Sequence, residues 1–478
     1  MRPVAQTISL TAFALLTTSA SRISGQAPLA PHQRLAREVY QELIEINTVD
    51  SVGSVTKAAQ AVAKRFLDAG FAAGDVHLLI PPGKPTKGNV IVRYRGRGQG
   101  KPILLLAHLD VVAALRSDWS IDPFVLTERD GYFYGRGTSD DKAMAAIFVA
   151  NLLRDRREGW VPDRDVILAL TADEEGGDAN GVEWLIAEHR DLIESAYAIN
   201  EGGGGASREG KPLFHTVQAA EKVPVNFTLT AINPGGHSSV PRSDNAIYEL
   251  VDALRRVANY KFPVELNEVT RGFFERTAAL EEPKVAAAMR AIVANPNDSA
   301  ASAVLSSNPR YNSTLRTTCV ATRLAGGHAY NALPQTASAN VNCRIVPTST
   351  PERVRDMLAT MIGDTGIKIT STVPIRERAG APPSPLLPEL MTPVTELTHT
   401  MFGTGVPVIP SMSTGATDGR FLRAAGIPTY GVSGLFSDPG DARAHGRDER
   451  LLVKSFYEGQ EFLERLVHRI AGGKSQVP

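Results

Sequence analysis

Residues 103–110 read ILLLAHLD, and this stretch decides the fold class that the sequence predicts. Consecutive apolar residues such as ILLLA are typical of a strand buried on both faces, as found at the centre of α/β sheets. His108 and Asp110 follow at the end of this predicted strand, which is where open α/β sheets place their ligands. Because residues two apart on a strand point to the same face, Asp110 can orient a metal-binding His108. A purely structural histidine is the alternative interpretation.

Strands and helices alternate on both sides of this stretch. This alternation predicts an α/β domain whose central sheet is largely parallel. Apolar residues at helical spacing predict helices over residues 33–46, 55–69, 143–154 and 182–189. Continuous apolar runs predict strands over residues 89–94 and 166–171.

A second unit begins near Glu221, where the pattern changes. Residues 223–232 alternate as an antiparallel strand does, and residues 266–308 are mostly helical in pattern. We therefore expect an inserted α+β domain over residues 222–376. The further elements expected in it are a helix at 246–257, strands at 316–324 and 337–346, and a helix at 351–361.

The remaining boundaries follow from this insertion. Residues 380–387 are rich in Pro and Ala and read as the return linker. We expect residues 28–221 and 377–478 to form the two parts of one catalytic domain, with a helix at 389–401 and a closing helix at 452–470.

Composition excludes several classes of protein. The chain has 478 residues, with 43% hydrophobic and 21% charged residues, which is ordinary for a soluble globular protein of two or three domains. Lys and Arg together number 51, as do Asp and Glu. No long-range field therefore directs the chain to nucleic acid or to an anionic membrane.

The N-terminus resembles an export signal. Arg2 precedes an apolar stretch at 8–16 and small residues that end at Ala20 and Ala27. We expect residues 1–27 to be a signal peptide and the protein to be secreted or periplasmic, without a membrane span. A disordered tail is the alternative.

Cysteine is too rare to build a thiolate metal site. Only Cys319 and Cys343 occur, so one disulfide or two buried thiols are the alternatives. Any metal must therefore be bound by histidine and carboxylate side chains.

Acidic residues follow further predicted strands. Asp140 and Asp141 lie at a Gly-rich turn that opens a helix, Glu174 and Glu175 follow the strand at 166–171, and Glu201 ends another apolar run. A solvated helix cap or acidic turn is the alternative for each. Together, however, clustered carboxylates without a cation would be strongly destabilising. The sequence therefore favours a bound zinc, cobalt or manganese ion.

Seven motifs in fixed order resemble one known family, the two-zinc peptidases. The family includes carboxypeptidase S, bacterial glutamate carboxypeptidase, broad-specificity dipeptidases, aminoacylase and succinyl-diaminopimelate desuccinylase. The resemblance runs from about residue 33 to the C-terminal helix and implies a zinc-peptidase catalytic domain with a mixed central sheet, plus an inserted α+β lid or dimerisation domain. The motifs are AHLDVV (107–112), DWSIDPF (118–124), GRGTSDDK (135–142), ADEE (172–175), NEGG (200–203), GGHSS (235–239) and HGRDE (445–449).

The resemblance implies roles for the residues in these motifs. Asp140 would bridge two zinc ions, Glu174 would be the general base, Asp110 would support the site, and the Asp140-Asp141 peptide bond would be cis. Departures occur at Ala143 and Ala113, where the family usually has Gly and often Pro. The implied metal ligands are His108, Asp140, Glu175, Glu201 and His445.

The resemblance also implies substrate contacts. His237 of the inserted domain would stabilise the oxyanion, in many members across a dimer interface. Asn331 and Arg344 match residues that contact substrate, with a turn and a surface charge as the alternatives. Arg344 and the loop that contains Gly415 and Thr417 would hold a substrate carboxylate.

These expectations define one function and two alternatives. The favoured function is a zinc-dependent hydrolase with two zinc ions, or cobalt or manganese in their place, that cleaves the amide bond of small peptides with a free C-terminal carboxylate. An N-acyl-amino-acid amidohydrolase would share every catalytic residue. A non-catalytic, metal-dependent peptide-binding protein is the alternative of another class, and the presence of Glu174 argues against it.

Overall fold

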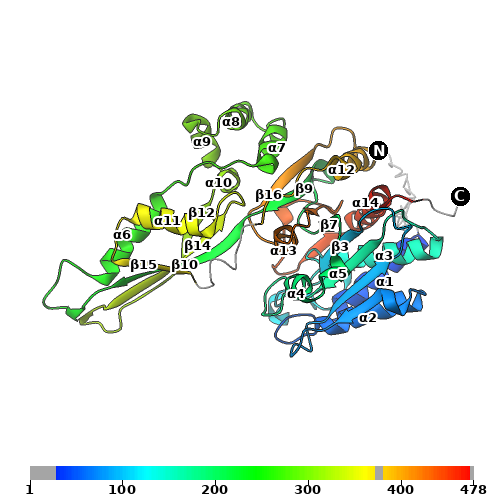
Figure 1. Cartoon of the computed structure of the whole chain (residues 1–478), viewed down its shortest axis with the longest axis horizontal. Coiled ribbons are helices and arrows are strands. Elements are labelled where there is room, and N and C mark those ends of the chain that lie inside the picture. The colour runs from blue at the N-terminus through cyan, green and yellow to red at the C-terminus, as the bar shows by residue number, and fades with distance from the viewer. Residues whose placement is uncertain (1–27, 372–380, 474–478) are drawn as a thin grey trace, which may run out of the picture.

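The computed structural model describes residues 28–371 and 381–473. The expected signal peptide at residues 1–27 lies outside these ranges. The chain forms one large α/β unit and a second, smaller unit that extends from it (Figure 1). Within the described ranges, no helix has both the length and the apolar character that crossing a membrane requires.

The large unit contains a mixed, ten-stranded sheet, as expected. Strands β6 (Val166–Thr171), β3 (Ile103–His108) and β7 (Tyr197–Asn200) are parallel neighbours, and β17 (Thr429–Gly431) continues the parallel part. The antiparallel neighbours lie on both sides of this centre. The other strands are β1 (Val76–Leu79), β2 (Asn89–Tyr94), β8 (Gly205–Arg208), β9 (Lys211–Glu221), β16 (Val408–Ser413) and β18 (Phe436–Ser437).

Strand β3 is buried on both faces because helices cover both sides of the sheet. Leu105 packs into the larger apolar core, whereas Leu104 and Leu106 pack into a second core on the opposite face. This explains the uninterrupted apolar run. The larger core is built with helices α1 (Pro31–Glu45), α2 (Val55–Asp68), α3 (Lys142–Glu158), α12 (Pro388–Phe402) and α14 (Val453–Ala471); the second is built with α4 (Gly181–Glu188), α5 (Arg190–Ile193) and α13 (Gly419–Ala424).

The smaller unit, called the lid below, has a four-stranded antiparallel sheet. Its strand order is β12 (Thr318–Gly326), β14 (Thr336–Ile345), β10 (Val223–Ile232) and β15 (Ile367–Ser371). Helices α6 (Ala246–Asn259) and α11 (Pro351–Ile362) pack on this sheet through a separate apolar core. Cys319 on β12 and Cys343 on β14 form a disulfide, which decides between the two alternatives that the sequence left open.

The helical segment within the lid region lies against the large unit. It consists of α7 (Glu268–Thr277), α8 (Pro283–Ala294), α9 (Ser299–Ser306) and α10 (Pro309–Leu315), which share a small core of their own. Arg276 of α7 donates a hydrogen bond to the carbonyl of Val408 on β16 at 2.6 Å. Figure 1 shows α7 beside β16. The segment therefore connects the lid to the large sheet.

Candidate metal centre

Three parallel strands bring acidic and histidine side chains to one edge of the large sheet. His108 ends β3, Glu174 and Glu175 follow the end of β6, and Glu201 follows β7. Parallel neighbours end at the same edge, which is why residues far apart in sequence meet there. His445 reaches the same place from the segment between β18 and β19 (Arg450–Leu452).

Asp140 lies between two groups of ligand atoms. Its Oδ1 is 3.0 Å from His108 Nε2, which is 3.9 Å from Glu201 Oε1. Its Oδ2 is 3.1 Å from His445 Nε2, which is 2.8 Å from Glu175 Oε1. Within each group one ligand atom per residue lies within 4.8 Å of the others. This arrangement fits two metal ions bridged by one carboxylate, with nitrogen and oxygen ligands of the kind that zinc accepts.

Asp110 supports the site in a different way from the one expected. Its backbone carbonyl, at 3.0 Å, contacts His108 Nδ1, while its carboxylate lies 3.6 Å from that nitrogen. The carbonyl contact leaves Nε2 of His108 directed at Asp140. The Asp110 carboxylate accepts hydrogen bonds from the backbone N–H groups of Glu174 and Glu175 at 3.2 and 3.0 Å. Asp110 thus orients both the histidine and the acidic turn.

Glu174 belongs to neither of the two ligand groups around Asp140. Burial raises the pKa of its carboxyl to about 8, and the nearby Asp418 and Glu175 carboxylates act in the same direction. A carboxyl group whose pKa lies near neutrality can accept and return a proton at working pH. Glu174 therefore lies beside the metal groups without belonging to either of them.

Glu449 holds the turn that presents Asp140. It is fully buried, and Arg136 pairs with its carboxylate at 2.6 Å. The same carboxylate accepts hydrogen bonds from the backbone N–H groups of residues 137, 139 and 140. Arg136 also donates to the carbonyl of His445 at 3.3 Å, so the pair positions ligands of both groups. The Asp140-Asp141 peptide bond within this turn is cis, as the resemblance implied.

Sequence reasoning quoted Glu449 as part of HGRDE but assigned it no role. A buried acid is indistinguishable from a surface acid in a loop sequence, and only the motif gave a signal for it.

Glu221 holds the Gly-rich loop that follows β16. Its carboxylate accepts from the N–H of Thr417 at 2.7 Å and from the Thr417 hydroxyl at 2.8 Å, and it pairs with Arg423 at 2.7 Å. Thr417, which was predicted to bind substrate, therefore uses both its backbone N–H and its hydroxyl in hydrogen bonds within the protein. In the same loop, the N–H of Gly415 donates to the Ser413 hydroxyl at 3.0 Å. Sequence reasoning did not identify Glu221.

The lid residues predicted to contact substrate are His237 on β11 (Gly236–His237), Asn331 in the loop just before β13 (Ala332–Leu333), and Arg344 on β14. His237 is exposed and lies beside Asn331, whose carbonyl accepts from Ser238 N–H at 3.0 Å. β11 pairs with β13. Arg344 lies on β14 opposite Thr318. Within the part of the chain that the structure describes, no hydrogen bond or ion pair joins His237, Asn331 or Arg344 to the metal groups.

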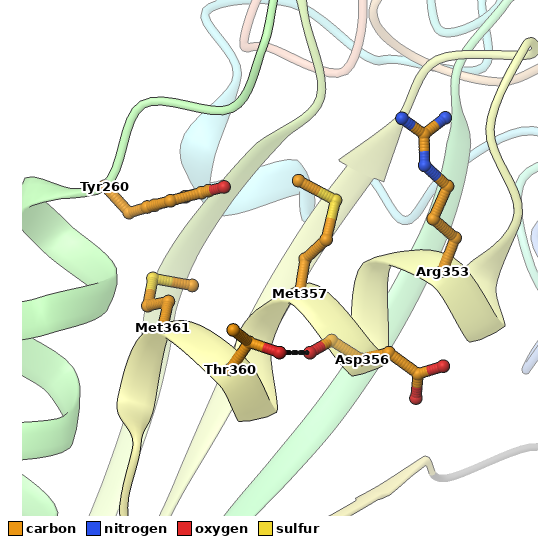
Figure 2. A pocket seen from close by; sticks show the side chains of 6 residues that line it. All are labelled: Tyr260, Arg353, Asp356, Met357, Thr360 and Met361. Carbon is orange, nitrogen blue, oxygen red and sulfur yellow. Dashed lines mark hydrogen bonds between the residues drawn. The ribbon is translucent and has the colours of Figure 1, made fainter.

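A separate hollow of about 490 Å³ lies on the helical face of the lid (Figure 2). Two methionines and a tyrosine form its apolar part. Its lining contains none of the residues that surround Asp140, so we place the chemistry at the sheet edge. The lining residues are Tyr260, Arg353, Asp356, Met357, Thr360 and Met361.

Comparison with known proteins decides the family. The model of peptidase family M20/M25/M40 matches residues 104–469. The chain belongs to this family. The resemblance that the motifs indicated is therefore confirmed, and so is the assignment as a metal-dependent hydrolase of peptide or related amide bonds. The alternative of a non-catalytic binding protein is set aside.

Individual M20 relatives and structures agree with this membership. "N-fatty-acyl-amino acid synthase/hydrolase PM20D1" of Xenopus tropicalis is 30% identical over 73% of this chain and 69% of its own length. "Probable carboxypeptidase S-like 2" of Dictyostelium discoideum is 28% identical over 79% and 74%. The crystal structure of the metallo-carboxypeptidase Sso-CP2 from Sulfolobus solfataricus has a TM-score of 0.67 at 19% identity, covering 91% of this chain and 99% of that one. It shares the fold.

Proposed function

We propose that this M20 family member uses two zinc ions to cleave the amide bond next to a free carboxylate, as a carboxypeptidase or dipeptidase does. The observation that carries the proposal is the position of Asp140, whose two carboxylate oxygens face separate histidine and carboxylate groups. A base that is not a ligand, Glu174, lies beside them. The same fit holds for cobalt or manganese, so the experiment below includes cobalt.

The protein groups have separate tasks in this proposal. Zinc, when bound, supplies Lewis acidity and lowers the pKa of water. Glu174 accepts the proton of the attacking water and returns it to the leaving amine. His237 stabilises the negative charge that develops on the carbonyl oxygen.

Substrate recognition in this proposal uses the loop at 413–417 and Arg344. An arginine fork and backbone N–H groups suit a carboxylate. The hydrogen bonds of Thr417 and Gly415 fix the loop in one conformation but occupy both of their N–H groups, so the carboxylate would be bound by Arg344 and by other N–H groups of the loop. Asn331, next to His237, would contact the substrate from the lid.

An N-acyl amino acid is the second candidate substrate. Such compounds also place a carboxylate next to the amide bond and differ only on the acyl side. The names of the relatives favour this candidate, since they include an N-fatty-acyl-amino acid synthase/hydrolase and aminoacylases. The two candidates share all the residues around Asp140.

We also propose that the lid forms a homodimer. β12 is an edge strand of the lid sheet, and it exposes the apolar side chains of Val320 and Leu324. Tyr248 and Val251 of α6 are exposed as well. Edge strands and apolar faces of this kind suit pairing with a second copy.

The proposed location is outside the cytoplasm, as a secreted or periplasmic protein. The disulfide between Cys319 and Cys343 supports it, because disulfides persist in oxidising compartments. The N-terminal sequence has the features of an export signal.

The experiment that tests the function compares substrates and metals. Protein depleted with a chelator would be assayed on dipeptides and N-acyl amino acids, with zinc or cobalt returned. We expect activity only after metal is returned. The group preferred on the acyl side of the amide bond then distinguishes a peptide substrate from an N-acyl amino acid. Full activity in a preparation shown to be free of metal would contradict the proposal.

A further inference from the structure

A third group of potential metal ligands lies away from the sheet edge. It consists of Asp155 on α3 and of Glu464 and His468 on α14. α3 begins next to Asp141, and at 1.5 Å per residue Asp155 lies about 20 Å further along the helix axis. The group is therefore separate from the metal centre described above. Glu464 and His468 are four residues apart, which places them on one face of α14.

The spacing of this group matches that of a group around Asp140. His468 Nε2 is 2.7 Å from Asp155 Oδ1 and 4.0 Å from Glu464 Oε1. In the metal centre, the corresponding distances from His108 Nε2 are 3.0 and 3.9 Å. Each group has one histidine nitrogen and two carboxylate oxygens within 4.8 Å of one another.

Glu464 has a carboxylate oxygen that the surrounding protein does not satisfy. Only 6% of Glu464 is exposed, and its Oε1 contacts Arg154 at 3.2 Å. Its Oε2 is buried and has no hydrogen-bond partner among the described residues. A buried acceptor without a partner costs about 1–3 kcal/mol, and more when it is charged. A cation beside Oε2 would remove this cost.

The charges around the group are also unbalanced. The carboxylates of Asp155, Glu158 and Glu464 surround a single guanidinium group, that of Arg154. A divalent cation would give these carboxylates a further positive partner. Buried carboxylates are costly unless such a partner is present.

His468 is oriented for binding and can be reached from solvent. Its ring stacks on Trp160 with 4.3 Å between centroids and an angle of 15°. The side chain is 32% exposed, so an ion can enter without unfolding of the helices.

From these observations, we propose that Asp155, Glu464 and His468 bind a divalent cation of the zinc type, which joins α14 to α3. One imidazole nitrogen and two carboxylates form a ligand set that zinc accepts, with water in the fourth position. The ion would fix the C-terminal helix to the helix that starts at the metal centre. This site is structural and does not depend on the proposed substrate.

The first experiment counts metal ions. The full chain would be dialysed against buffered zinc, and bound zinc per chain would be measured by mass spectrometry. We expect Glu464→Gln and His468→Gln each to bind one zinc fewer than the unaltered protein while retaining its activity. Glu461→Gln is the matched control, because Glu461 lies on the same helix in an exposed pair with Arg465. It should bind as much zinc as the unaltered protein.

A second measurement reports on the site itself and guards against a folding defect. Cobalt bound to His468 should quench the fluorescence of Trp160, so the cobalt quench should be smaller in Trp160→Phe and in His468→Gln than in the unaltered protein. Circular dichroism would establish that each variant is folded. Equal zinc content in the unaltered protein and both ligand variants would overturn the proposal. A cobalt quench in His468→Gln that is as large as in the unaltered protein would overturn it too.

Discussion

Glu174 and Glu175 are neighbours in the chain, yet their carboxylates have different surroundings. Glu175 Oε1 lies 2.8 Å from His445 Nε2, whereas Glu174 belongs to neither group around Asp140. Asp110 fixes this difference by accepting both of their backbone N–H groups. At the scale of single residues, one acid is thus available as a ligand and the other as a base.

Replacing Glu174 with Gln tests this division. Gln keeps the shape of the side chain but cannot accept the proton, so we expect turnover to fall by at least about 10²-fold. Metal content should stay at the level of the unaltered protein. Glu175→Gln is the matched comparison and should lose metal. If Glu174→Gln lost metal as well, Glu174 would have to be reassigned as a ligand.

Arg344 tests the preference for a free carboxylate. We expect a dipeptide or N-acyl amino acid to be cleaved far better than the same compound with an amidated C-terminus. Losing a charge-assisted hydrogen bond of roughly 1.5–3 kcal/mol corresponds to about 10- to 150-fold in kcat/KM. Arg344→Ala should reduce the preference by a factor in this range. Equal rates on acid and amide, unaffected by Arg344→Ala, would remove the carboxylate from the proposal and leave the metal chemistry intact.

At the scale of elements, the turn before α3 depends on a contact with the far end of the chain. Glu449 accepts from three backbone N–H groups of this turn and pairs with Arg136. Both partners are buried, so removal of one charge leaves the other without a partner in a medium of low polarity. The conformation of the turn is therefore set by residues about 310 positions away in sequence.

Glu449→Gln should be destabilising for this reason. Breaking a buried ion pair typically costs about 3–5 kcal/mol, and we expect a loss of this size in the free energy of unfolding measured with denaturant. Metal affinity should fall as well, since the turn presents Asp140. Glu396→Gln removes an exposed pair with Arg469 and should cost at most about 1 kcal/mol. Similar losses of unfolding free energy in the two variants would show that the buried ion pair contributes no more to stability than the exposed one.

Elements with a clear apolar pattern could be predicted, and the others could not. The strand predicted at 103–106 extends two residues further as β3, and the helix predicted at 452–470 agrees with α14 to within one residue. β9 was not predicted, because the buried polar residues His215 and Gln218 interrupt its apolar pattern. His215 has its partner, Thr398, on the distant helix α12. β16 contains Pro410, which usually argues against a strand.

Residues of the site could likewise be predicted only where an apolar run or a motif pointed to them. His108 and the acids at the strand ends could be located from the apolar runs before them. His445 lies in an irregular segment with no local signal, and only the resemblance indicated it. Glu221 and Glu449 act through hydrogen bonds between distant segments, which a single sequence does not reveal.

At the scale of the whole molecule, the connection to the lid and the Gly-rich loop share one buried network. β9 ends at Glu221 and β10 begins at Val223, so Glu221 lies where the chain leaves the large sheet. Its carboxylate holds Thr417 and Arg423, and the Thr417 hydroxyl also accepts from Asn200 at 3.2 Å. Asn200 precedes Glu201. The lid junction, the loop and one metal ligand are thereby linked through three side chains.

Glu221→Gln should loosen this network and impair substrate binding more than the chemical step. Gln keeps the shape but loses the charge that pairs with Arg423, so the loop at 413–417 would no longer be held in one conformation. We expect KM for a substrate with a free carboxylate to rise about 10-fold, a loss of about 1.4 kcal/mol, with a smaller change in kcat. The amidated substrate should be affected less, because it does not use the loop. Metal content should not change, since Glu221 is not among the ligand groups. A variant with unaltered KM for both substrates would show that the loop keeps its conformation without the Glu221 charge, and the link between the lid junction and substrate binding would then be wrong.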